Sequence, residues 1–256
     1  MLLVIDVGNT NIVMGAMDGY TVSCRTWIET DRAADTEAYT RRIREALCSA
    51  GLTSFAFEGA VLSSVVPSIN DALCQAVKNL TGCTCLVVTT AMRTDMPILM
   101  EEPDTLAADI LTGCVEAKAE YPLPLAVVDM GTATTVMVVD SQGCFRGGAI
   151  IPGVKLSLSA MVKGTSLLPD MELYAPEKCI GAGTESAMCS GLVYGAAAMV
   201  DGLVDRMEAE LGEPMQVVFT GGLSGLVGPH CRRKVFFEPD LLLKGMVRLY
   251  EKNVKQ

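Results

Sequence analysis

Histidine, aromatic residues and positive charge are all scarce in this sequence. Its 256 residues include one histidine, one tryptophan, six tyrosines and six phenylalanines. The single histidine, His230, is not expected to bind zinc, because a zinc site needs about four converging ligands. Lysine and arginine number 20 against 30 acidic residues, which leaves a formal net charge of −10. Since an acidic surface repels phosphodiesters and anionic headgroups, we expect neither a nucleic-acid partner nor a membrane partner.

Long hydrophobic runs are also missing. The longest uncharged run, Ser186–Val200, contains Gly, Ser and Ala and is shorter than the roughly 20 apolar residues of a membrane helix, so it predicts a buried helix. The first residues lack a basic segment, and Asp6 stands where a signal peptide has apolar residues. No pair among the ten cysteines has C-x-x-C spacing. We therefore expect a cytoplasmic location and reduced, mostly buried thiols.

The order of the predicted elements indicates an α/β fold, because short β-branched runs alternate with helical periodicity. Strands are expected at residues 2–7, 11–17, 21–27, 59–65, 86–88, 125–129, 134–139, 144–150 and 216–220. Helices are expected at residues 35–49, 69–80, 104–119, 185–211 and 239–252. The Tyr121–Pro124 segment, with two prolines, cannot continue a helix. We therefore predict two domains, residues 1–120 and 121–256.

An internal repeat opens each half of the chain. Residues Leu3–Asn11 return in similar form as Ala126–Thr134, each a buried strand that ends in Asp-x-Gly and is followed by a second strand. Such a hairpin places a carboxylate, Asp6 or Asp129, at its tip beside a glycine that allows close backbone approach. Two facing tips would clamp a polyphosphate and its Mg²⁺ between two similar domains. The simpler alternative is a pair of ordinary hairpins with glycine turns.

A third glycine site follows a buried strand near the end of the chain. The strand Val217–Thr220 runs into Gly221 and Gly222, whose N–H groups could contact the sugar or phosphates of a nucleotide. A tight turn without a ligand is the alternative for this site. Its significance comes from its combination with the two hairpins.

These motifs together resemble the type III pantothenate kinases. The matching segments occur in the family's order and cover nearly the whole chain: Asp6–Thr10, Ser63–Pro67, Asp129–Thr134, Gly147–Gly153, Thr220–Gly222 and Pro239–Gly245. The resemblance implies two ribonuclease-H-like domains of the actin and sugar-kinase superfamily. It also implies a homodimer with active sites at the subunit interface.

The resemblance further implies an ATP-dependent kinase that phosphorylates the terminal hydroxyl of pantothenate, the first committed step of coenzyme A biosynthesis. The implied nucleotide-binding residues are Asp6, Gly8, Asn9 and Thr10 for the first phosphate site, Gly131, Thr132 and Thr134 for the second, and Gly221 and Gly222 on the nucleoside side. Asp6 would hold Mg²⁺ through water. Asp129 would bind an activating monovalent cation, K⁺ or NH₄⁺.

The acceptor side departs from the family pattern. The family's Gly-Ala-Asp-Arg motif corresponds here to Ala107–Ile110, which keeps Asp109 as the implied general base but replaces the arginine with Ile110. Losing one charge-assisted hydrogen bond costs about 1.5–3 kcal/mol. The family's Tyr-x-Asn-Pro becomes Met100–Pro103, with Glu102 in place of Asn. Its Gly-Lys-Asn-Thr becomes Gly181–Thr184, so the implied acceptor-binding residues are Ala107, Thr184 and Thr165.

Three hypotheses remain open on the sequence. The first is a pantothenate kinase with an altered acceptor pocket, in which Arg25, Arg93, Lys163 or another cation replaces the missing arginine. The second is a kinase for another small hydroxyl compound. The third is a catalytically silent structural or regulatory subunit in a mixed dimer with an intact relative, which is physically possible because an interface site can take groups from both subunits.

Overall fold

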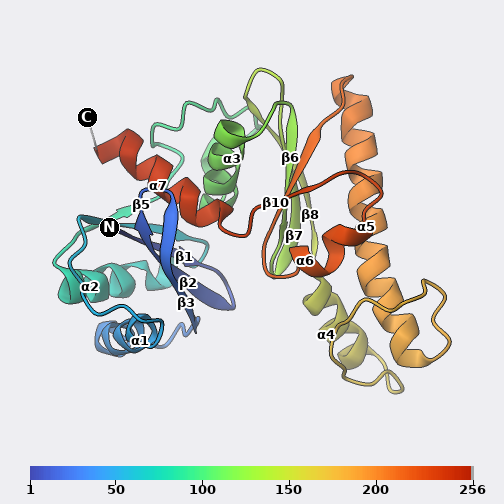
Figure 1. Ribbon diagram of the computed structural model, residues 1–256, viewed down its shortest axis with the longest axis horizontal. Coiled ribbons are helices and arrows are strands. Elements are labelled where there is room, and N and C mark those ends of the chain that lie inside the picture. Colours follow the sequence, from blue (N-terminus) through green and yellow to red (C-terminus); the bar gives the residue numbers. More distant parts are fainter. Residues whose placement is uncertain (255–256) are drawn as a thin grey trace. The chain divides into compact units, whose positions relative to one another are not determined.

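The computed structural model describes residues 1–254, which form two compact units (Figure 1). Unit 1 contains residues 1–96, 101–116 and the described residues from Asp240 onward, and unit 2 contains residues 97–100 and 117–239. The division expected after residue 120 assigned the last segment to the second domain. In the structure this segment belongs to unit 1, because its helix packs on strands of that unit.

Unit 1 is built around a five-stranded sheet. Its strands, in spatial order, are β3 (Thr21–Glu29), β2 (Asn11–Asp18), β1 (Leu2–Val7), β4 (Gly59–Ser64) and β5 (Cys85–Val87). The first three are antiparallel neighbours, whereas β4 and β5 run parallel to β1. In β1 and β4 nearly every residue is buried, as expected for strands covered on both faces.

Helices α1 (Thr36–Ser49) and α2 (Asn70–Thr81) contribute to the main core of unit 1. Asp35 begins α1 by accepting a hydrogen bond from the N–H of Ala38 at 2.9 Å, which satisfies one unpaired donor of the first turn. Tyr39, Ile43 and Leu47 repeat at helical spacing and are completely buried. Their burial is what holds the start of α1 in a defined position.

Two further helices meet in unit 1, namely α7 (Leu241–Val254) and the first part of α3 (Ala108–Glu120). Gly245 lets them approach closely, since a Cβ there would come within 2.8 Å of the Thr112 methyl group. The guanidinium of Arg248 donates to both oxygens of Glu116, at 2.7 and 3.3 Å. Because Glu116 is 1% exposed, this ion pair compensates a buried charge and fixes α3 against α7.

Unit 2 repeats the sheet of unit 1. Its strands, in spatial order, are β8 (Phe145–Pro152), β7 (Ala133–Val139), β6 (Leu125–Met130), β9 (Gln216–Thr220) and β10 (Phe236–Phe237). The strands β6, β7 and β8 are antiparallel, and β9 and β10 run parallel to β6. The internal repeat of the sequence is therefore a repeat of topology, and the α/β prediction is confirmed.

The core of unit 2 contains residues of α4 (Val154–Gly164) and α5 (Thr184–Leu211), which pack with its sheet. Within residues 1–254, α5 is the one helix whose length and composition would suit a membrane span, and 56% of its most apolar window is buried inside the structure. Its buried residues belong to the core of unit 2. The prediction that Ser186–Val200 is a buried helix is thereby confirmed.

Several element boundaries differ from the expected ones. Helix α3 begins at Ala108 instead of residue 104, because Pro103–Thr105 forms a short 3-10 turn. Helix α4 and the two-residue strand β10 were not predicted. All ten cysteines are free, but the expectation of mostly buried thiols is wrong, since only Cys24, Cys114 and Cys189 are buried.

Candidate active site

The predicted first phosphate loop connects β1 to β2 in unit 1. Asp6 is the penultimate residue of β1, and the N–H of Gly8 donates to the Asn11 carbonyl at 2.9 Å, which closes the turn. Asn9 and Thr10 at the tip are exposed. The structure thus presents the amide and hydroxyl groups that the sequence predicted for phosphate binding.

A neighbouring residue that the sequence analysis missed supports this loop. The hydroxyl of Thr30, the residue that follows β3, donates to the Gly8 carbonyl at 2.7 Å. The N–H of Thr30 donates to the Thr10 carbonyl at 2.9 Å. The two bonds join both sides of the loop to the segment after β3, so the loop is fixed at two points. Nothing in the local sequence pattern marks Thr30, because its role depends on how β3 pairs with β2.

The predicted second phosphate loop connects β6 to β7 in unit 2. The N–H of Gly131 donates to the Ala133 carbonyl at 3.1 Å, which is the counterpart of the Gly8 bond. Gly131 and Thr132 are exposed, whereas Thr134 is only 1% exposed. Of the three predicted residues, two are therefore exposed on the loop, and Thr134 is buried within β7.

Gly153, at the start of α4, packs directly against the second loop. Its N–H donates to the Thr132 carbonyl at 3.1 Å. A Cβ at this position would lie 2.5 Å from the carbonyl oxygen of Gly131 and closer still to that of Thr132. Only glycine allows the helix to approach the loop so closely. Gly153 closes the Gly147–Gly153 motif of the sequence, whose pattern alone does not indicate this contact.

The turn after β9 brings Gly221 against the same loop region of unit 2. Gly221 has φ +87°, and a Cβ there would lie 2.6 Å from the Met130 nitrogen and closer still to the Asp129 carboxylate. Ser224 donates to the Gly221 carbonyl at 2.7 Å, and Gly222 is exposed. Asp129 and Gly221, which are far apart in the sequence, are therefore direct neighbours.

We expect Gly221→Ala to weaken Mg-ATP binding by at least tenfold. The new methyl group requires a left-handed backbone that alanine disfavours, and it would displace Met130 and the Asp129 carboxylate. Calorimetric titration of Mg-ATP measures the effect, with Gly225→Ala as the control because a Cβ at that helical position meets no atom within 4 Å. Equal affinities for Gly221→Ala and the unmodified protein would contradict the expectation.

Asp109 lies in the first turn of α3, beside Ala107, which precedes the helix. Its Oδ1 accepts the backbone N–H of Ile110 at 2.7 Å. Burial raises the pKa of the Asp109 carboxyl above its ordinary value, although hydrogen bonds from the backbone act in the opposite direction. A partly buried carboxylate with a raised pKa is suited to accepting a proton.

The other predicted acceptor-binding residues lie in unit 2. Thr184 is the exposed first residue of α5. Thr165 follows α4 and is also exposed, but its hydroxyl donates to the Met161 carbonyl at 2.9 Å. Both residues are exposed, and the Thr165 hydroxyl is engaged in this bond to α4.

The acidic segment before α3 is solvated, since Glu101 and Glu102 are exposed. Among the cations considered as replacements for the missing arginine, Arg25 is already paired with Asp240 at 3.0 Å. Arg93 and Lys163 are exposed.

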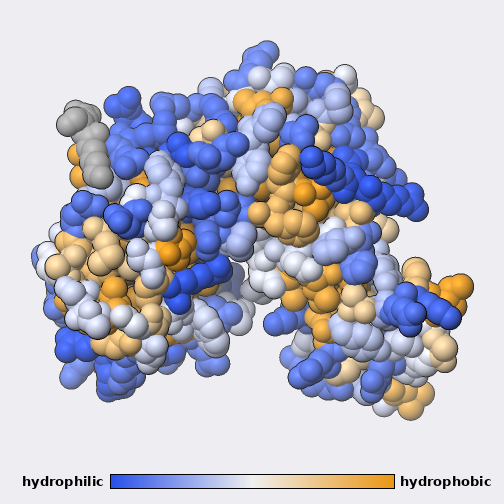
Figure 2. Space-filling view, in the orientation of Figure 1, coloured by the Kyte–Doolittle hydropathy of each residue, from blue (hydrophilic) through white to orange (hydrophobic). Residues whose placement is uncertain are grey.

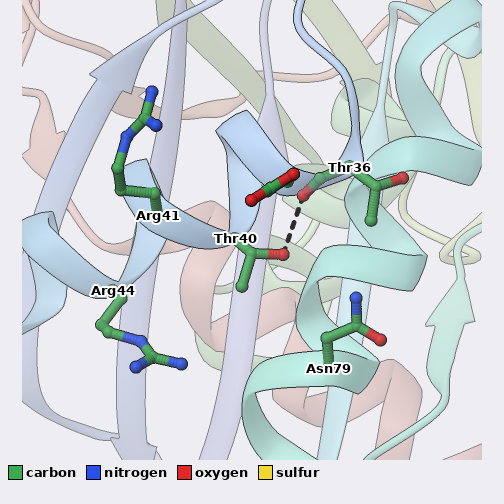
Figure 3. Close-up of a pocket in the computed structure, with 6 residues that line it drawn as sticks. Thr36, Thr40, Arg41, Arg44 and Asn79 are labelled. Atoms are coloured by element: carbon green, nitrogen blue, oxygen red, sulfur yellow. Dashed lines mark hydrogen bonds between the residues drawn. The ribbon is translucent and has the colours of Figure 1, made fainter.

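A surface hollow separate from these residues lies between α1 and α2. It is lined by Thr36, Glu37, Thr40, Arg41, Arg44 and Asn79 (Figure 3). The Thr40 hydroxyl bonds the Thr36 carbonyl at 2.8 Å, and the two guanidinium groups diverge. None of the predicted site residues lines this hollow, so it provides a position for control substitutions.

Among the described residues, no group of three or more His, Cys, Asp or Glu side chains could hold a metal ion. Mg²⁺ binds proteins through one or two carboxylates and completes its shell with water and substrate phosphates. Asp6, at the end of β1 beside the exposed phosphate loop, offers such a carboxylate.

Comparison with solved structures shows the fold. A Baf family protein from Campylobacter jejuni aligns over 99% of this chain and 100% of its own, with a TM-score of 0.62 and 15% identity. The activator of 2-hydroxyisocaproyl-CoA dehydratase from Clostridium difficile, solved with bound ADPNP, aligns over 97% of this chain and 93% of its own, with a TM-score of 0.52 and 11% identity. The architecture is that of two ribonuclease-H-like domains.

Sequence comparison gives the family. Residues 2–206 match the family model described as type III pantothenate kinase. The type III pantothenate kinase of Moorella thermoacetica is 38% identical over 253 residues, which are 99% of this chain and 100% of that protein. The corresponding enzyme of Exiguobacterium is 38% identical over the full length of both chains. This chain belongs to the type III pantothenate kinase family.

Proposed function

We propose that this protein transfers the γ-phosphoryl group of ATP to the terminal hydroxyl of pantothenate in the cytoplasm, as the first committed step of coenzyme A biosynthesis. The observation that carries this proposal is the match to pantothenate kinases over the whole length of the chain. The retained carboxylates Asp6, Asp109 and Asp129 support it. So do the two phosphate loops, which have the same turn in both units.

The two loops would bind the phosphates of ATP. In unit 1 the exposed side chains of Asn9 and Thr10 offer hydrogen-bond donors, and in unit 2 Gly131 and Thr132 are exposed on the equivalent turn. Phosphoryl transfer depends mainly on positioning and on neutralising charge. When bound through Asp6 and water, Mg²⁺ would supply that neutralisation.

Asp109 would act on the acceptor hydroxyl. As the hydroxyl oxygen forms its bond to the γ-phosphorus and the bond to the ADP oxygen breaks, the hydroxyl proton moves to the Asp109 carboxylate. The proton then returns to solvent. The raised pKa of Asp109 favours this transfer, because a more basic carboxylate holds the proton better.

A monovalent cation, K⁺ or NH₄⁺, would bind beside Asp129. The carboxylate is a hard oxygen ligand of the kind that K⁺ accepts. Adding K⁺ or NH₄⁺ in place of Na⁺ should therefore raise the rate of ADP release, and Asp129→Asn should remove that dependence.

A related candidate is a kinase for a different small alcohol. The specific observation behind it is Ile110, which occupies the first turn of α3 next to Asp109 where a pairing arginine is expected. An isoleucine cannot bind the carboxylate of pantothenate, so the acceptor could lack one. A panel of hydroxyl-bearing metabolites tested for stimulated ADP release separates this candidate from the first.

We also propose that the protein is a homodimer. Exposed large apolar side chains concentrate in one stretch of unit 2: Ile150, Leu156, Leu167, Tyr174 and Ile180. Leu167 is 90% exposed and Ile180 is 89% exposed. Figure 2 shows apolar residues on the surface around α4 and the nearby end of α5. Several exposed apolar side chains in one part of the surface would suit a protein interface.

We expect the double substitution Leu167→Asp/Ile180→Asp to yield a monomer. Two buried carboxylates at an apolar interface would be desolvated without partners, which opposes association. Light scattering coupled to size exclusion measures the mass. Trp27→Ser, which alters an exposed aromatic residue of unit 1, serves as the control and should leave the dimer intact. A dimer that survives the double substitution places the interface elsewhere.

The direct test of the function is ADP release by the purified protein with Mg-ATP and K⁺, with and without pantothenate at high concentration. Turnover that depends on pantothenate supports the proposal. If pantothenate does not stimulate the rate above that of Asp109→Asn while Mg-ATP still binds, the assignment is wrong, and another acceptor or a silent subunit is indicated.

A further inference from the structure

Arg32 contacts the tip of the first phosphate loop. It lies in the connection between β3 and α1, and its Nη2 donates to Oδ1 of Asn9 at 2.9 Å. Both residues are exposed, and 23 positions separate them in the sequence. Asn9 was predicted to bind phosphate, whereas Arg32 was assigned no role. The contact therefore links a residue outside the motif to the predicted binding loop.

The segment that carries Arg32 is anchored to α1. The buried Tyr39 donates its hydroxyl to the Asp31 carbonyl at 2.6 Å. Arg42 donates to the Glu29 carbonyl at 2.7 Å. Because both anchors belong to one helix, the residues immediately before Arg32 have a defined path. Arg32 is thus presented to Asn9 by a supported connection.

The bond determines how the Asn9 amide is oriented. An amide side chain has one acceptor oxygen and two N–H donors, whereas a guanidinium has donors only. When Arg32 binds Oδ1, the Nδ2 donors of Asn9 remain for an acceptor such as a phosphate oxygen. The positive charge of Arg32 also polarises the amide, which strengthens those donors.

We propose that Arg32 is a positioning residue for nucleotide phosphates, which acts by holding the Asn9 amide with its donors directed at the phosphate. This role depends on the proposed function at one point only, namely that the β1–β2 loop binds phosphate. It does not depend on the identity of the acceptor. Lysine would keep the charge of Arg32 but not its planar group of donors. Arg32→Lys should therefore retain only part of the affinity for Mg-ATP.

The test is a calorimetric double-mutant cycle on Mg-ATP binding with Arg32→Ala, Asn9→Ala and the pair. We expect Arg32→Ala to weaken Mg-ATP binding about tenfold, corresponding to about 1.4 kcal/mol. Once Asn9 is alanine, adding Arg32→Ala should change the affinity less than twofold. Arg44→Ala, at the exposed arginine of the hollow in Figure 3, should match the unmodified protein.

Three results would overturn the inference. Arg32→Ala could bind Mg-ATP as tightly as Arg44→Ala. The two single effects could multiply in the double variant, which would mean that Arg32 acts independently of Asn9. Adenosine binding could weaken as much as Mg-ATP binding, which would indicate a general structural role. A protein that binds Mg-ATP but does not phosphorylate pantothenate contradicts only the proposed acceptor, whereas absence of Mg-ATP binding contradicts both.

Discussion

Asp109→Asn is expected to lower kcat for pantothenate phosphorylation by about 10²–10⁴-fold, the usual contribution of a general base. Asparagine has nearly the same shape but cannot accept the hydroxyl proton. Steady-state ADP release at saturating Mg-ATP and pantothenate measures the loss. Asp104→Asn is the matched control, because Asp104 is an exposed carboxylate in the 3-10 turn just before α3. A rate for Asp109→Asn within threefold of this control would exclude Asp109 as the base.

The same substitution should not destabilise the fold. Since burial raises the pKa of Asp109, the folded protein binds its proton more tightly than the unfolded chain does. The ionised carboxylate therefore opposes folding at pH values above the folded-state pKa, and stability increases as the pH falls through that value. Asparagine removes this unfavourable charge. We expect the Tm of Asp109→Asn at pH 8 to equal or exceed that of the unmodified protein, so a loss of rate cannot be attributed to unfolding.

The pH dependence of the reaction should show the titration of Asp109. The base must be ionised, so kcat/KM for pantothenate falls as the pH drops through the raised pKa of Asp109. The acidic limb should lie above the ordinary aspartate value of 3.8. Asp109→Asn should abolish this limb in its residual activity. A limb at or below the ordinary value would contradict the raised pKa.

Ile110→Arg is expected to lower the KM for pantothenate by about tenfold to a hundredfold. A guanidinium at this position could pair the pantothenate carboxylate, and one charge-assisted hydrogen bond is worth about 1.5–3 kcal/mol. Ile110 is partly exposed in the first turn of α3, so a longer polar side chain can reach solvent. The cost of a cation near a helix N-terminus, about 0.3–1 kcal/mol, is smaller than the expected gain.

Ile110→Met controls for the change of shape without adding charge. Arginine beside Asp109 should also lower the pKa of that carboxyl, which would move the acidic limb of the profile to lower pH. A lower KM for pantothenate together with an acidic limb at lower pH would show that the new charge acts at the site. If Ile110→Arg and Ile110→Met have the same KM for pantothenate, another residue already binds its carboxylate or the acceptor is a different compound.

The elements that the sequence predicted best are those whose pattern is local. The strands β1 and β9 were predicted with the bounds that the structure shows, because continuous apolar runs end at Asp-x-Gly or at Gly-Gly. The two-residue strand β10 was missed because it is too short to show a periodicity. Helix α3 was predicted four residues too early, since Asp104 resembles a helix cap but lies in a 3-10 turn.

The sequence by itself determined the repeated hairpins, the residue types at their tips and the likeness to a kinase family, because each depends on neighbouring residues. Only the tertiary structure decided that α7 joins unit 1, that Gly221 lies against Asp129, and that Arg32 bonds to Asn9. These contacts join residues far apart in the chain. Their geometry follows from strand pairing and helix packing, so no local pattern of residues could predict them.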